Sequence, residues 1–175
     1  MELSRRQSLL ERMKGAAMLD VPTYEEVEAD TTATGQAAIV VGIVAIASAI
    51  GGFRGGTYLM VSAIIGAYLG WAVWSAVTYY VGTWLGGTAT WGEMLRTIGF
   101  AQSPGVFLVL GIIPFLGGLA RLVVAVWMLV AGVIAIRQAL DFDTTKAVIT
   151  AVIGFVLYLV AAMILGLLIG LPMHL

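Results

Sequence analysis

Long apolar stretches alternate with short polar connections along most of this chain, and the pattern predicts membrane-spanning helices. A helix needs about 20 mostly apolar residues to cross roughly 30 Å of hydrocarbon. Five segments approach or exceed that length, with charges only near their ends: 36–53, 57–82, 98–118, 119–138 and 146–170. The predicted fold is therefore all-α, a polytopic transmembrane bundle of five spans. Asp143 is expected to cap the fifth helix.

The third apolar segment, residues 98–118, is the least regular of the five. Pro104, Pro114 and five glycines interrupt it. Proline removes a backbone donor and clashes with the preceding turn, and carbonyls freed in lipid need other partners. We expect a kinked or broken span that its neighbours shield, with a re-entrant hairpin as the alternative. The polar residues 86–96 before it are expected to form a loop or a surface-lying turn.

Residues 1–34 form a separate N-terminal segment, because they hold four of the nine Lys and Arg and seven of the ten Asp and Glu. Four apolar residues recur there at helical spacing: Leu3, Leu10, Met13 and Ala17. The spacing predicts an amphipathic helix on a membrane surface or a partner, ending at Pro22. The alternative is a helix packed on the protein's own loops. The acidic run 24–30 is expected to be solvated or to start a helix, and residues 35–172 to form the five-helix domain.

Composition supports a membrane protein. Of the 175 residues, 61% are hydrophobic and 11% charged, whereas soluble domains carry roughly 25% charged residues. The net charge of −1 does not favour nucleic acid as a partner. With no cysteine, disulfides and thiolate chemistry are excluded. The first twenty residues lack the continuous apolar core of a secretory signal peptide.

Loop charges predict the orientation of the chain. With five spans, the side of the N-terminus holds seven Lys and Arg, and the other side holds Arg54 and Arg121. Basic loops stay in the cytoplasm, so we expect a cytoplasmic N-terminus in the cell (inner) membrane. If the third segment were re-entrant, the side of the N-terminus would hold six Lys and Arg and the other side three.

Candidate chemistry is scarce. The spans contain almost no ionisable side chain, and His174 is the single histidine. Three serines, at positions 62, 75 and 103, have no histidine or lysine in plausible reach to activate them. We therefore predict no enzyme activity, no metal site and no cofactor.

Paired glycines are the clearest candidates for function. Each pair, spaced four residues apart, leaves one helix face without side chains, so that two helices approach closely in lipid. The pairs are Gly66 and Gly70, Gly82 and Gly86, and Gly166 and Gly170. Packing within the bundle is the first interpretation, and an interface with other membrane proteins or a second copy is the alternative. Trp71 and Trp74 are expected to be packing residues.

Several short motifs have a familiar order and spacing. They are Glu25 to Asp30 before Thr-Gly-Gln, Leu95 to Pro104 with its Gly99-Phe100 pair, Pro114 with Gly117-Gly118, and Arg137 to Asp141 before Thr144 to Ala147. Over about residues 20–170, this arrangement resembles bacterial members of the Yip (Ypt-interacting protein) domain family. The resemblance implies a multipass protein with a cytoplasmic N-terminus.

Eukaryotic members of that family bind prenylated Rab-type GTPases in early secretory traffic. We do not expect their long N-terminal domain in this protein, and Phe100 stands where tyrosine is common in the family, so GTPase binding is not carried over.

The leading hypothesis is a non-enzymatic membrane scaffold or accessory subunit that acts through helix–helix contacts. The alternative is a channel or carrier for a small neutral or lipophilic solute, because a broken helix at membrane depth often lines a cavity. An enzyme comes third and would have to use Glu93, Arg96, Gln102 and Ser103. A site beyond the outer contact faces is expected first within residues 99–114.

Overall fold

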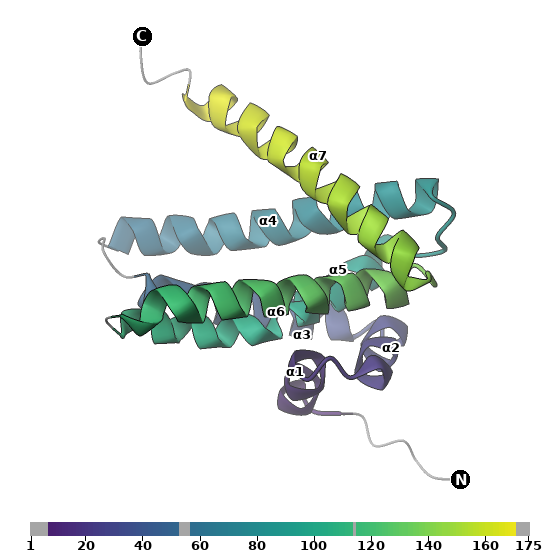
Figure 1. The fold of residues 1–175 in the computed structure, drawn as a ribbon, viewed down its shortest axis with the longest axis horizontal. Helices are drawn as coiled ribbons and strands as arrows, with labels where there is room; N and C mark the ends of the chain where they lie inside the picture. The colour runs from purple at the N-terminus through teal and green to yellow at the C-terminus, as the bar shows by residue number, and fades with distance from the viewer. Residues whose placement is uncertain (1–6, 53–56, 114, 171–175) are drawn as a thin grey trace.

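The computed structural model describes residues 7–52, 57–113 and 115–170, and the regular elements in these ranges are all helices. Side chains are described in these ranges except at 57–60, 162 and 165–170. The elements are α1 (Leu9–Ala17), α2 (Val21–Ala29), α3 (Ala33–Gly51), α4 (Thr57–Trp84), α5 (Trp91–Ala101), the 3-10 helix η1 (Ser103–Ile112), α6 (Leu116–Ala139) and α7 (Thr144–Gly170). Figure 1 shows α1 and α2 on one flank of the long helices, while α7 diverges from α6 towards the C-terminus.

Five helical stretches are long and apolar enough to cross a membrane, which confirms the predicted all-α fold with five spans. They are Ala33–Gly51, Val61–Trp84, Trp91–Ile112, Leu116–Ala139 and Thr144–Ala161. The predicted cap of the fifth helix is present, because the amide N of Lys146 donates to Asp143 Oδ1 over 3.0 Å.

The third span begins earlier than the sequence pattern predicted. A capping box, in which Thr90 and Glu93 satisfy each other's backbone amides, starts α5 at Trp91. This pair of side chains turns most of the expected loop 86–96 into the first turns of a helix. The expectation of a loop was therefore wrong from Trp91 onward.

The middle of the third span changes helix type. The α-helix ends at Ala101, and η1 continues from Ser103 to Ile112. Pro104 stands in the first turn of η1, a position where its missing donor breaks no hydrogen bond within the helix. A proline kink is thus not confirmed at Pro104, and Pro114 lies outside the described residues. The neighbours do shield this span: 50% of its most apolar stretch is buried, against 11% for Val61–Trp84.

The N-terminal helices pack on the bundle of the same chain. Arg12 and Ala16 of α1 are buried, and Trp127 of α6 donates its indole N–H to the Ala17 carbonyl over 2.7 Å. The first helix therefore packs on other helices of its own chain and not on loops. Pro22 does not end the helical pattern but lies in the first turn of α2, whose N-cap is Asp20.

Close backbone contact joins α3 to η1 at the end of the bundle away from α1 and α2. A Cβ added to Gly111 would lie 2.6 Å from the Gly51 carbonyl oxygen, and one added to Gly117 would lie 2.7 Å from the Gly111 carbonyl oxygen. Arg121 of α6 donates to the Gly51 carbonyl over 3.0 Å. Only glycine permits these approaches.

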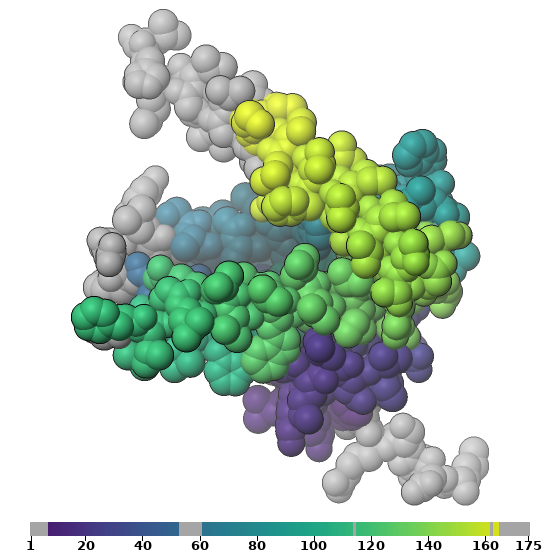
Figure 2. Space-filling view, viewed as in Figure 1, coloured from purple at the N-terminus to yellow at the C-terminus, as the bar shows by residue number. Residues whose placement is uncertain are grey.

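The bundle is unevenly covered along its length. Ala147, Thr150 and Ala151 in the first half of α7 are buried, whereas no described side chain from Phe155 to Ile164 is. Figure 2 shows α7 leaving α6, with a hollow between the two helices.

Candidate functional site: a cavity at the middle of the spans

A cavity of about 380 Å³ lies among α4, the third span, α6 and α7. Its lining residues are Gly66, Ala67, Gly70, Trp71, Trp74, Ile98, Ala101, Gln102, Met128, Gly132, Phe155 and Tyr158. The residues come from four helices that are distant in sequence, so the cavity is a product of the bundle and not of one segment.

The cavity lies near mid-depth of the spans. Gly70 stands at the middle of α4, Tyr158 at the middle of α7, and Gln102 at the middle of the stretch Trp91–Ile112. If each helix crosses the hydrocarbon, the cavity is near the bilayer centre, where no water is present to satisfy polar groups.

Aromatic rings form the walls of the cavity. The rings of Trp74 and Tyr158 meet edge to face with centroids 5.9 Å apart. The indole N–H of Trp71 donates to the Leu95 carbonyl over 3.0 Å, which holds α4 against α5. Trp71 and Trp74 are therefore packing residues, as expected, and they also face the cavity.

Two polar side chains at the cavity have no hydrogen-bond partner in the part of the chain that the structure describes. They are the Gln102 amide and the Tyr158 hydroxyl. Gln102 follows the end of α5, and its backbone N–H donates to the Gly99 carbonyl over 3.2 Å. The break in helix type thus places an amide group at mid-depth.

The paired glycines have different surroundings. Gly66 and Gly70 line the cavity, where a Cβ on Gly66 would meet nothing within 4 Å and one on Gly70 would lie 3.2 Å from the Tyr158 hydroxyl. Gly82 packs against the Leu140 side chain, and Gly86 has φ +91 in the turn that follows α4. Gly166 and Gly170 belong to α7, but their surroundings lie outside the described residues.

The residues of the family motifs also separate into two places. A Cβ on Gly99 would lie 2.7 Å from Ala37 Cβ and 3.3 Å from Trp71 Nε1. Phe100 and Pro104 are also buried. Arg137 and Asp141 lie elsewhere, at the end of α6 that approaches α2. Asp141 has φ 54 where α6 ends and accepts a hydrogen bond from Thr88 Oγ1 over 2.7 Å.

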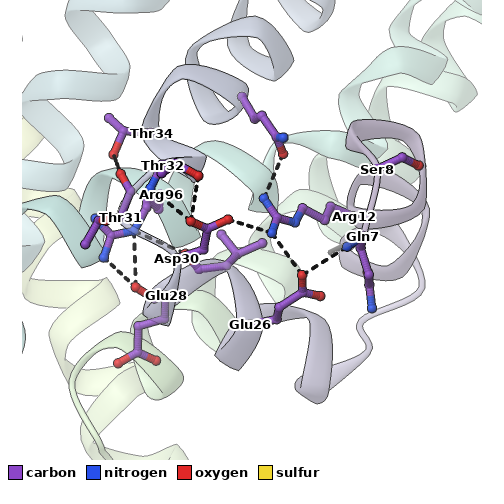
Figure 3. A network of polar contacts seen from close by, with 12 residues as sticks. Gln7, Ser8, Arg12, Glu26, Glu28, Asp30, Thr31, Thr32, Thr34 and Arg96 are labelled. Atoms are coloured by element: carbon purple, nitrogen blue, oxygen red, sulfur yellow. Dashed lines mark hydrogen bonds and ion pairs between the residues drawn. The ribbon is translucent and has the colours of Figure 1, made fainter. Parts of the chain in front are cut away.

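A buried guanidinium holds α1 and α2 to the bundle (Figure 3). Arg12 Nη2 lies 2.9 Å from Glu26 Oε1 and 2.7 Å from Asp30 Oδ2. Its Nη1 donates to Gln36 Oε1 of α3 over 2.9 Å. The Arg12 side chain is 1% exposed. Burial lowers the pKa of Arg12, but the hydrogen bonds and charges of both carboxylates more than offset this and raise it.

Two acids of the run 24–30 are therefore paired with Arg12 and not simply solvated. The sequence alternates basic and apolar positions in the first helix, and this pattern did not distinguish Arg12 from its neighbours. Its partners are 14 and 18 residues away in sequence, beyond the range of helical periodicity.

A second arginine joins α5 to α2. Arg96 Nε donates to the carbonyls of Val27 and Glu28, over 3.1 Å in each case. These carbonyls belong to the last turn of α2, where a cation is favoured because the carbonyls lack helical partners.

The residues that an enzyme would need are not assembled into one site. Glu93 caps α5, and Ser103 Oγ donates to the Phe100 carbonyl over 2.6 Å. Arg96 is engaged with α2, so only Gln102 of this set faces the cavity. Among the described residues, no group of three His, Cys, Asp or Glu side chains is placed to hold a metal ion.

Five apolar spans with a polar N-terminal cap define the class of protein: a multipass helical membrane protein. The sequence model of the Yip1 domain family matches residues 17–168, from the end of α1 into α7. The chain therefore belongs to the Yip1 domain family. No curated protein and no solved structure matches the chain.

Proposed function

We propose that this protein is a non-enzymatic membrane scaffold or accessory subunit that acts through helix–helix contacts with other membrane proteins. The observation that carries the proposal is the uncovered part of α7 between Phe155 and Ile164. Phe155, Val156 and Leu157 are all exposed, and three consecutive helical residues point in directions about 100° apart. Apart from the Tyr158 ring, which meets Trp74 of α4, the chain's own described helices thus leave this part of α7 largely uncovered.

The adjacent part of α4 offers the small residues that helix contacts in lipid require. Gly66 and its neighbours Ile65 and Leu69 are exposed, and a Cβ added to Gly66 would meet nothing within 4 Å. Helices associate in lipid mainly by close packing, which small residues permit. The outer parts of α4 and α7 together therefore suit a transmembrane helix of a partner protein.

Site-specific photo-crosslinking in intact membranes tests this proposal. A photoreactive residue at Val160 of α7, 44% exposed, is expected to give one discrete protein adduct. Val126 of α6, 55% exposed, is the matched control and is expected to give lipid adducts only. Differently tagged copies of the chain distinguish a second copy from another protein. Equal protein adducts at both positions, or none at Val160, would contradict the proposal.

The proposal also places the N-terminus in the cytoplasm of the cell (inner) membrane, on the basis of the loop charges. The absence of cysteine from the sequence makes single-cysteine labelling unambiguous. Leu10→Cys, at an exposed position of α1, should react with a membrane-impermeant maleimide only after the cytoplasmic face is opened. Phe115→Cys, just before α6 and fully exposed, should react in intact cells. The opposite pattern would reverse the orientation.

A further inference from the structure

We propose that the mid-depth cavity binds one neutral amphiphile, a long-chain molecule whose single hydroxyl or carbonyl group pairs with Gln102 and Tyr158. This inference goes beyond the scaffold function, because it concerns a small lipophilic ligand and requires no partner protein.

Unsatisfied hydrogen-bonding groups indicate what the cavity holds. The Gln102 amide and the Tyr158 hydroxyl have no partner among the described residues, and each can both donate and accept. In hydrocarbon, an unpaired polar group of this kind is unfavourable, because no water is present to form the missing hydrogen bond. A ligand hydroxyl can accept from the Gln102 amide and donate to the Tyr158 oxygen, and a ligand carbonyl can accept from both groups.

The lining of the cavity excludes charged ligands. None of its twelve residues carries a charge at neutral pH. An ion or a zwitterionic headgroup at mid-depth would therefore lack a countercharge and would be strongly disfavoured. The ligand's polar end must be neutral and small.

Size and shape indicate that the rest of the ligand is an apolar chain. The cavity volume of about 380 Å³ lies in the range of ligand pockets, about 300–1,000 Å³. Trp71 and Trp74 offer apolar ring surface beside the polar pair. Gly66 and Phe155 at the rim are exposed, so a longer chain can pass between α4 and α7 into the surrounding lipid.

Glycines create the space. A Cβ on Gly66 or Gly132 would meet nothing within 4 Å, although both residues line the cavity. A leucine at either position would occupy volume that the proposed ligand needs, without colliding with the protein at its Cβ. These positions allow the cavity to be filled while both polar groups stay intact.

Tryptophan quenching by a brominated probe tests the proposal. The probe is hexadecan-1-ol carrying bromine on two adjacent mid-chain carbons, added to the full chain in phosphatidylcholine nanodiscs. We expect saturable quenching that unbrominated hexadecan-1-ol displaces and hexadecane does not. The correspondingly brominated hexadecane and palmitate should quench only in proportion to their concentration in the bilayer.

Four variants connect the binding to the cavity. Gln102→Leu and Tyr158→Phe should each weaken probe binding about 2- to 12-fold, the effect of losing one ordinary hydrogen bond. Gly132→Leu should abolish the saturable component. Gly35→Leu, at an exposed helical glycine outside the cavity with open space around it, should change nothing.

Tyr158→Phe removes a single oxygen atom, so it remains a test even if a larger substitution prevents folding. Equal saturable binding of the alcohol and the alkane would overturn the proposal. Unchanged binding in the Gln102→Leu, Tyr158→Phe double variant would do the same. The crosslinking assay at Val160 is independent of the quenching assay. A negative quenching result therefore contradicts only the ligand proposal and leaves the scaffold proposal to the crosslinking result.

Discussion

Around Arg12, polar contacts join α1, α2 and α3 into one body, and Arg96 adds α5. In the outer part of α7, the described residues from Phe155 to Ile164 are apolar apart from Tyr158, and none of them is buried. The physical requirements of the Arg12 region and of the outer part of α7 are opposite. A buried charge must be paired within the protein, whereas an apolar side chain facing lipid carries no penalty.

The difference indicates where stability and interaction reside. Substitutions in the paired region should alter the free energy of unfolding, because they leave charged groups without partners. Substitutions in the uncovered region should leave it almost unchanged and should alter only contacts with other molecules.

Arg12→Met should be the most destabilising of the changes considered. It leaves the carboxylates of Glu26 and Asp30 facing each other without a cation, and breaking a buried ion pair by removing one partner costs about 3–5 kcal/mol. Denaturation in mixed micelles, followed by tryptophan fluorescence, measures the loss. Proteolysis between α1 and α2 should become faster while the spans stay protected.

Lys14→Met is the matched control for Arg12→Met, because Lys14 belongs to the same helix but is exposed. Its effect should be within about 0.5 kcal/mol, as for most surface changes. Equal destabilisation by the two substitutions would contradict the role assigned to Arg12.

Gly51→Ala and Gly66→Ala should have effects of opposite sign. A Cβ at Gly51 would overlap the Leu108 carbonyl of η1, and such overpacking costs about 1–3 kcal/mol. At Gly66 the space is open, and replacing a helical glycine with alanine stabilises by about 0.5–1 kcal/mol. The same denaturation assay compares them, and two losses of equal size would refute the difference in packing.

Asp143→Ala should cost about 1 kcal/mol, as for other lost N-caps. It removes the acceptor for the Lys146 amide at the start of α7, in the well-packed part of that helix. Asp143→Asn retains a capping oxygen and should lose less. Thermal unfolding of both variants distinguishes capping from a general loss of charge.

Glu28 should make stability depend on pH. Burial, together with the charges of Asp141, Glu93 and Glu25, raises the pKa of this carboxyl from 4.5 to about 7, although Arg96 opposes the shift. The folded protein therefore binds the proton more tightly than the unfolded chain. Stability should fall as the pH rises from about 4.5 to about 7.

Glu28→Gln should flatten that part of the pH profile and stabilise the protein above pH 7. Unfolding midpoints at a series of pH values between about 4 and 8 test this. An unchanged slope in the variant would exclude Glu28 as the source.

Much of the fold could be predicted from local pattern. Apolar length located the spans, because the bilayer imposes one length on every crossing helix. The start of α5 was missed because the capping box of Thr90 and Glu93 depends on two polar side chains in a stretch that resembles a loop. The Arg12 network was missed because its members come from three helices.

Gly66 and Gly82 show where prediction from the sequence ends. Each begins the same spacing of two glycines, which predicts a helix face without side chains. The prediction was wrong for Gly82 and Gly86, because α4 ends at Trp84 and Gly86 lies in the following turn with φ +91. Tertiary structure places Leu140, the residue that follows α6, against Gly82 and leaves open space at Gly66. The residues that contact a given helix face come from segments that are distant in the sequence, so the local pattern does not reveal them. The sequence thus determined the five spans. Only packing decided that one face is filled and another, with Gln102 and Tyr158, borders a cavity.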